Sequence, residues 1–111
     1  MNDLITEIQE KTKLLDTAIS QLSKRGQVYA NSERTYRIAL AKRILEFRES
    51  GVPVTIISDL CRGDKEIAGL RFERDCAEIV YKSAQEAINN YKLQIRILDA
   101  QVQREWGGRD G

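Results

Sequence analysis

The chain has 111 residues, of which 41% are hydrophobic and 32% are charged, and its net charge is +1. This composition is too apolar for a disordered chain and too charged for a membrane protein, and the length predicts a single domain. The sequence contains no histidine, which excludes histidine-based catalytic triads and histidine zinc sites.

The N-terminal stretch MNDLITEIQEKTKLL has acidic residues where a signal peptide has a basic start and an apolar core. No apolar run approaches the roughly 20 residues needed to span a bilayer. We therefore expect a cytoplasmic protein without membrane partners. In that compartment Cys61 and Cys76 are expected to be reduced and to behave as small apolar residues, and a disulfide between them is the alternative.

The first predicted element is a helix over about residues 3–48. Twelve positions from Ile8 to Phe47, spaced alternately by four and three residues, form one stripe, and eight of them are apolar. Gly26 is the weak point, because glycine costs about 1 kcal/mol in a helix interior. An alternative is therefore a chain that folds back near Gly26 into a three-helix bundle.

The second predicted element is a bend with a short helix over about residues 51–63. Gly51 is expected to end the first helix, and Pro53 cannot continue it. Thr55 is expected to cap the short helix. Its apolar residues are expected to cover the open end of a helical hairpin; they are Ile56, Ile57 and Leu60.

A DNA-reading helix-turn-helix is the competing interpretation of residues 51–71. That motif needs apolar residues on both sides of the glycine in its turn, where this chain has Arg62 and Asp64 around Gly63. The helix that follows is also much longer than a groove-reading helix requires. The pattern favours a bend over a helix-turn-helix.

The third predicted element is a helix over about residues 65–106. Ten of the twelve stripe positions from Ile67 to Glu105 are apolar, and Asp64 is a suitable N-cap. Two glycines at 107–108 are expected to stop the helix after Trp106 and to leave a flexible tail over 107–111.

The elements together predict an all-α fold, a long antiparallel helical hairpin that resembles a coiled coil and has a short helix at the bend. The second long helix carries more apolar residues than one partner helix can cover. We therefore expect two chains to associate into a four-helix bundle. The expected oligomer interface comprises Phe72, Cys76, Ile79, Val80, Leu93 and Ile97.

The sequence holds no recognisable catalytic machinery. The phosphate-binding and dinucleotide-binding glycine patterns are absent, and two cysteines alone make no structural zinc site. Carboxylates such as Glu73, Asp75 and Glu78 stand among basic residues, which indicates ion pairs rather than a magnesium site. We predict that the protein is not an enzyme and uses no cofactor or metal.

Basic residues gather near the predicted bend, whereas the first sixteen residues are more acidic. Two interpretations are open: contact of the bend with phosphates or with a partner, or a solvated face with local ion pairs, which the near-zero net charge favours. The candidate contact residues are Arg34, Arg37, Lys42, Arg43, Arg48, Arg62, Arg71 and Arg74. Trp106, at the end of the last helix, is a candidate partner anchor or a cover for the end of the bundle.

Several stretches resemble small helical proteins encoded by bacteriophages and prophages of Gram-positive bacteria. They are GVPVT at 51–55, RGD at 62–64, LRFERDCAEIVY at 70–81 and NNYKLQIRILDAQVQREW at 89–106, and the resemblance covers roughly residues 35–106. It implies a phage accessory protein of the host cytoplasm that binds a host or phage enzyme or assists DNA handling. It transfers no site residue.

The leading functional hypothesis is a non-enzymatic protein that binds another protein, for example to inhibit or adapt a host nuclease, a defence system or a replication protein. One alternative is a nucleic-acid-binding protein of phage replication or recombination that uses the basic bend. Another alternative is a structural bundle in a virion assembly.

Overall fold

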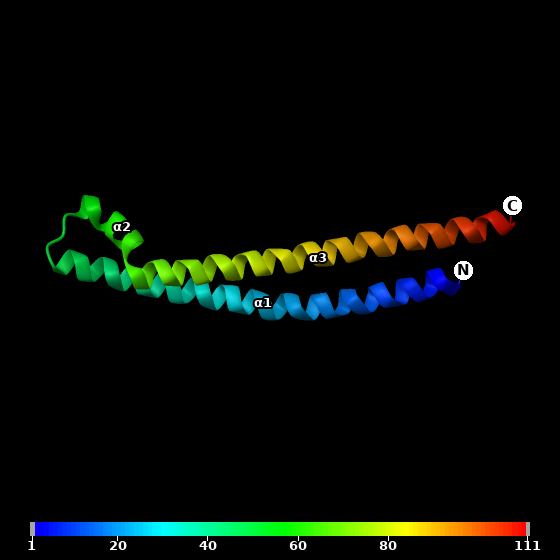
Figure 1. Ribbon diagram of the computed structural model, residues 1–111, viewed down its shortest axis with the longest axis horizontal. Helices are drawn as coiled ribbons and strands as arrows, with labels where there is room; N and C mark the ends of the chain where they lie inside the picture. Colours follow the sequence, from blue (N-terminus) through cyan, green and yellow to red (C-terminus); the bar gives the residue numbers. More distant parts are fainter. Residues whose placement is uncertain (1, 111) are drawn as a thin grey trace. The chain divides into compact units, whose positions relative to one another are not determined.

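The computed structural model describes residues 2–110, and the side chains of residues 2–107. Within that range the chain forms three helices, α1 (Asn2–Glu49), α2 (Val54–Gly63) and α3 (Lys65–Asp110), and no strand (Figure 1). The predicted fold class, an all-α helical hairpin with a short helix at the bend, is confirmed.

The contacts within the chain gather into two compact units. The bend unit comprises residues 25–81, with the second half of α1, all of α2 and the start of α3. The terminal unit comprises residues 1–24 and 82–111. In each unit the segments of α1 and α3 lie side by side and antiparallel (Figure 1). The sequence predicted one domain; two units arise because each part of a helical pair contacts only the segment directly opposite it.

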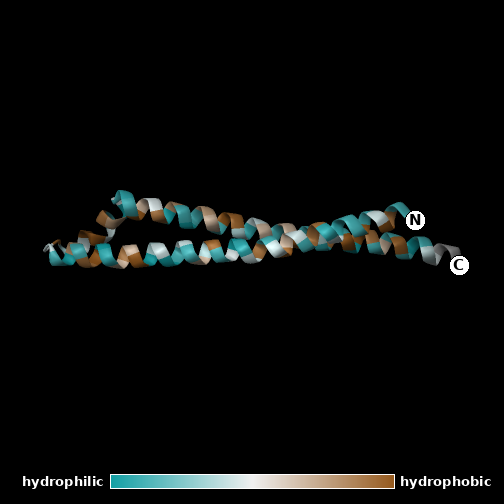
Figure 2. Ribbon diagram, turned by 90° about the horizontal axis from the view of Figure 1, so that it is seen from below, coloured by the Kyte–Doolittle hydropathy of each residue, from teal (hydrophilic) through white to brown (hydrophobic). Residues whose placement is uncertain are grey.

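The apolar stripes define the faces that meet between α1 and α3. Ten of the twelve predicted stripe positions on α1 and eleven of the twelve on α3 are at least half-buried. Figure 2 shows hydrophobic residues recurring along both helices between hydrophilic ones. On α1 the exceptions are Thr12 and Ile19, whose neighbours Lys11 and Ala18 take the half-buried places.

Gly26 lies inside an unbroken α1, so the alternative of a chain folded back at this residue is wrong. A Cβ atom at Gly26 would lie 3.2 Å from Cε2 of Tyr81 on α3, which is closer than an ordinary van der Waals contact. The glycine thus gives the tyrosine ring room against the backbone of α1, and this close approach explains a residue that lowers helix propensity.

The end of α1 is fixed by Gly51, which has a φ of +82°. Its N–H donates to the carbonyl of Arg48 at 3.1 Å, and the N–H of Val52 donates to the carbonyl of Phe47 at 3.0 Å. These two bonds form a Schellman motif, in which glycine is favoured because it adopts a positive φ without a Cβ clash. The predicted end of the helix at Gly51 is confirmed.

The start of α2 differs from the prediction. Its N-cap is Pro53, with φ −56° and ψ 134°, and the carbonyl of Pro53 accepts a hydrogen bond from the N–H of Ile56 at 3.1 Å. Thr55 therefore lies in the first turn, and the prediction that it caps the helix is wrong. The extended backbone at the proline already sets the entry into the helix, so no side-chain cap is formed.

Asp64 alone separates α2 from α3. Its Oδ1 accepts a hydrogen bond from the backbone N–H of Ile67 at 3.1 Å, so the predicted N-cap of α3 is confirmed. A junction of one residue also lacks the turn of three or four residues that a helix-turn-helix uses.

The most buried side chains lie where α2 packs on the other two helices. Ile57, Cys61 and Ile67 are 5%, 2% and 2% exposed. Ile56 and Leu60 stay at least 40% exposed, so the prediction that they also cover the hairpin end is wrong. One turn separates residues 57 and 61 on one face of α2, and residues 56 and 60 lie on its flank.

The end of α3 lies beyond the predicted position. The helix continues through both glycines to Asp110, so the prediction that it ends after Trp106 with a tail from 107 is wrong for residues 107–110. Glycine lowers helix propensity but does not forbid the helix, and no proline follows that would. Residue 111 lies outside the described residues.

Candidate functional site

A groove of about 580 Å³ opens in the bend unit, between α1, α2 and α3. Five arginines line it, and no aspartate or glutamate does; they are Arg37, Arg48, Arg62, Arg71 and Arg74. Its apolar lining comprises Leu40, Ile44, Val54, Ile57, Cys61, Ile67 and Ala68, and Tyr36 and Ser58 complete it. The groove therefore combines an apolar floor with a cationic rim.

Each of the three helices contributes to the rim one exposed arginine that forms no ion pair with a described residue. Arg48 comes from the last turn of α1, Arg62 from the last turn of α2 and Arg71 from the second turn of α3. All three are exposed, and none forms an ion pair with another described residue. These guanidinium groups keep their hydrogen-bond donors available to a ligand.

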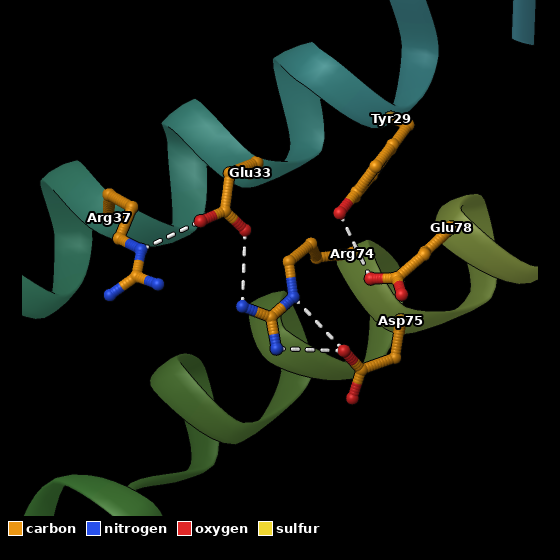
Figure 3. Close-up of polar contacts among 6 residues, drawn as sticks. All are labelled: Tyr29, Glu33, Arg37, Arg74, Asp75 and Glu78. Carbon is orange, nitrogen blue, oxygen red and sulfur yellow. Dashed lines mark hydrogen bonds and ion pairs between the residues drawn. The ribbon is translucent and has the colours of Figure 1, made fainter. Parts of the chain in front are cut away.

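The other two rim arginines share one carboxylate, which bridges the two long helices (Figure 3). Glu33 on α1 accepts a hydrogen bond from Arg37 at 2.7 Å and one from Arg74 of α3 at 3.1 Å. Arg74 also donates to Asp75 at 3.0 and 2.8 Å. Its guanidinium stacks over the ring of Tyr36, 4.7 Å from the ring centre.

These contacts shift the pKa values of Glu33 and Arg74 in the direction that keeps both groups charged. The hydrogen bond from Arg37, followed by that from Arg74, lowers the pKa of Glu33 against the opposing effect of partial burial. The pKa of Arg74 is raised, first by its hydrogen bonds to Asp75 and then by its hydrogen bond to Glu33. Both ends of the bridge therefore remain ionised at neutral pH.

Arg43 was predicted among the contact residues, but it does not line the groove. It forms ion pairs with Glu46 at 3.2 Å and with Glu66 at 3.0 Å, and it also pairs with Asp64. It therefore fastens α1 to the junction of α2 and α3. Its guanidinium already pairs with these three carboxylates, so a contact role for Arg43 stays a prediction that the groove does not support.

Of the eight predicted contact residues, the five rim arginines come together in the groove, whereas Arg34 and Lys42 are exposed on α1 outside it. Arg74 forms ion pairs with Asp75 and Glu33, as the alternative of local ion pairs would have it, but Arg71 has no ion pair among the described residues. The bend unit has ten basic and nine acidic residues, and the terminal unit eight of each. The cationic rim is thus a local arrangement within a nearly neutral molecule.

Tyrosines on the stripe support the bend unit from within. The hydroxyl of Tyr29 donates to Oε2 of Glu78 at 3.0 Å across the two helices. Its ring lies 5.9 Å from the ring of Tyr81, centre to centre. Half-buried rings with a hydrogen-bonded hydroxyl are typical of packing residues.

The residues predicted for an oligomer interface are all exposed in the chain. Trp106, the predicted anchor, is 51% exposed.

Cys61 is buried, Cys76 is exposed and both are free thiols, so the disulfide alternative is wrong. Within residues 2–110, no group of three or more possible metal ligands and no helix suited to cross a membrane is found.

The arginines of the rim were predicted from the sequence, but the apolar groove between the helices was not. The residues of α2 that complete the groove, such as Val54 and Ser58, gave no signal of their own. Which flank of the α1–α3 pair a short helix covers depends on the backbone path through the bend. That path is not encoded in the periodicity of the helices.

Comparison with protein families, with curated proteins and with solved structures gave no match. The function is therefore inferred from the geometry of the chain.

Proposed function

We propose that the protein has no catalytic activity of its own and acts by binding proteins, beginning with a second copy of itself. The observation that carries this proposal is a row of exposed apolar side chains on α3. Phe72 is 70% and Ile79 is 64% exposed, with the exposed Cys76 between them. Isolated apolar residues on a surface are ordinary, but a row on one helix face is typical of an interface.

The spacing of this row places it on a single face. Residues 72, 76 and 79 alternate by four and three, which is the repeat of a helix that packs against another helix. The residues that meet α1 in the same segment form a different, half-buried set; they are Leu70, Arg74, Ala77 and Tyr81. In the terminal unit Leu93 and Ile97, 50% and 56% exposed, are four residues apart. Each unit thus has an apolar face on α3 that α1 does not cover.

The exposed area is large enough for a second copy to cover part of it. The chain exposes 8162 Å². A compact monomer of this mass exposes about 6,200 Å² by the usual scaling with mass. The surplus of about 2,000 Å² exceeds the ~800 Å² per partner that a stable interface of standard size buries.

Two copies meeting through the same face form an isologous dimer, and the two hairpins then make a four-helix bundle. A second copy always offers a face of matching pattern. The resemblance to phage proteins supports the wider role proposed for such a dimer, which is to bind a host or phage protein.

The test is sedimentation equilibrium of the wild type and of two double variants. Wild type is expected at twice the 12.7 kDa of one chain, in 1 M NaCl as well as at low salt, because apolar burial is not screened. Phe72→Glu with Ile79→Glu should yield monomers. The matched control, Ile38→Glu with Leu45→Glu, changes two similarly exposed apolar residues seven apart on α1 and should remain dimeric.

Two results would contradict the proposal. One is a wild type that sediments as a monomer at every concentration. The other is an equal loss of association in both double variants, which would show that association does not depend on the α3 face in particular. Circular dichroism of each variant checks that the helices persist.

A further inference from the structure

We infer that the arginine-lined groove of the bend unit binds an acidic amphipathic helix presented by a partner protein. This inference rests on the proposed protein-binding function, although not on self-association. The groove and the exposed face of α3 are different surfaces, since Phe72 and Ile79 do not line the groove.

Charge complementarity points to carboxylates as the ligand groups. Arg48, Arg62 and Arg71 line the groove, one from each helix, and none of them forms an ion pair with a described residue. Glu33 of the chain itself bridges the other two rim arginines at 2.7 and 3.1 Å. The carboxylates of a partner would make the same kind of charge-assisted hydrogen bond with the remaining three.

The floor requires that the ligand also bring apolar surface. Seven apolar side chains line it, and Val54 at its edge is 70% exposed. A helix with apolar residues at positions i, i+3, i+4 and i+7 lays one ridge into such a groove and carries its polar residues along the flanks. Glutamates on those flanks would then meet the arginines of the rim.

The same features disfavour nucleic acid in this groove. Binding to a phosphate backbone uses cationic side chains and gains nothing from an apolar floor. Base stacking needs an open aromatic face. The one aromatic residue of the groove, Tyr36, already has the guanidinium of Arg74 over its ring at 4.7 Å.

The experiment measures binding of a fluorescent helical peptide of about 18 residues by anisotropy. Its apolar ridge is leucine at i, i+3, i+4 and i+7, and its flanks are glutamate. The groove variant is Arg48→Glu, Arg62→Glu and Arg71→Glu in the full chain. The matched control is Arg34→Glu, Lys42→Glu and Lys65→Glu, which makes the same change in net charge at exposed residues outside the groove.

The groove variant should weaken peptide binding by about 30-fold or more, because three favourable charge contacts become repulsive. The control should weaken it by no more than about threefold, through the long-range field alone. A second peptide, with glutamine in place of leucine, should bind the wild type at least about tenfold more weakly, since it leaves the floor uncovered.

Three results would overturn the inference: equal binding by the groove and control variants, equal binding of the leucine and glutamine peptides, and no peptide binding by the wild type. A fourth arm uses a single-stranded and a duplex oligonucleotide of about 20 nucleotides. If the wild type bound either oligonucleotide more tightly than the peptide, and the groove variant lost that binding, the groove would be assigned to nucleic acid instead. Sedimentation of the same samples separates the two proposals. Dimers that bind no peptide would contradict peptide binding in the groove but would leave self-association through α3 standing.

Discussion

The bend unit and the terminal unit are built from the same two long helices, yet they bury their side chains differently. Among the side chains that the structure describes, three of the four buried hydrophobic residues, Ile57, Cys61 and Ile67, lie in the bend unit, and the fourth, Ile88, lies in the terminal unit. Two helices leave one side of every contact open, and a third helix closes it. The short helix α2 therefore closes a core in the bend unit, and the buried residues Ile57, Cys61 and Ile67 also line the groove.

Polar contacts also join the helices of the bend unit. In the bend unit α1 is tied to α3 by Arg74 with Glu33, and to the junction after α2 by Arg43 with Asp64. Such pairs fix the relative rotation of the helices, which apolar stripes alone leave less specified. These contacts suit the bend unit to hold a shaped binding site.

The largest expected effect comes from the enclosed core. Ile67→Ala should lower the free energy of unfolding by about 3 kcal/mol, because the cavity it leaves is walled by three helices. Ile88→Ala should cost less, about 2 kcal/mol, since a helical pair collapses more easily around a deletion. Urea denaturation at a low, fixed protein concentration measures both.

The control for these two variants is Ile38→Ala, at a residue that is 64% exposed. It should change the stability by no more than about 0.5 kcal/mol. If Ile88→Ala proved more costly than Ile67→Ala, the contrast between an enclosed bend unit and an open terminal unit would be wrong.

A smaller effect is expected at the end of α1. Gly51→Ala should destabilise the chain by about 1–2 kcal/mol, because alanine is strained at a φ of +82°. Gly63→Ala is the control, since it lies in α2 at negative φ and a Cβ there meets no atom within 4 Å. That variant should be neutral or stabilising by up to about 1 kcal/mol. A thermal melt in which both variants behave alike would contradict the role of the Schellman motif.

The smallest effect concerns the bridge of Glu33 to Arg37 and Arg74. Because the pKa of Glu33 is lowered in the folded chain, its contribution is fully present above the unfolded value and is lost as pH falls through the lowered folded value. Glu33→Gln should therefore lower the melting temperature at pH 6–7, and the difference from wild type should vanish in acid. The control is Glu49→Gln, which removes a carboxylate that forms no ion pair with a described residue. A difference between wild type and Glu33→Gln that is constant with pH would count against the bridge.

The parts of the fold that were predictable are those that depend on neighbouring residues. The stripes from Ile8 to Phe47 and from Ile67 to Val102 follow from spacing, and Gly51 and Asp64 mark ends by their local backbone chemistry. The end of α3 was mispredicted because glycine only lowers helix propensity.

The parts of the site that were not predictable depend on how helices turn toward one another. Arg43 and Arg48 are five residues apart and look alike in sequence, yet one is surrounded by carboxylates and the other lines the groove. The side of α1 that α2 covers decides between them. That choice is made by the bend and by packing at Ile57 and Cys61 rather than by any local pattern.

The most direct test of self-association through α3 is the rate at which the unmodified chain is alkylated at Cys76. This thiol is exposed within the proposed interface, whereas Cys61 is 2% exposed and serves as a slow internal reference. Mass spectrometry after iodoacetamide treatment, at rising protein concentration, gives both rates. If two copies cover the α3 face, the rate at Cys76 will fall as the concentration passes the dissociation constant. A rate at Cys76 that stays constant from the nanomolar range to the highest concentration would contradict the dimer.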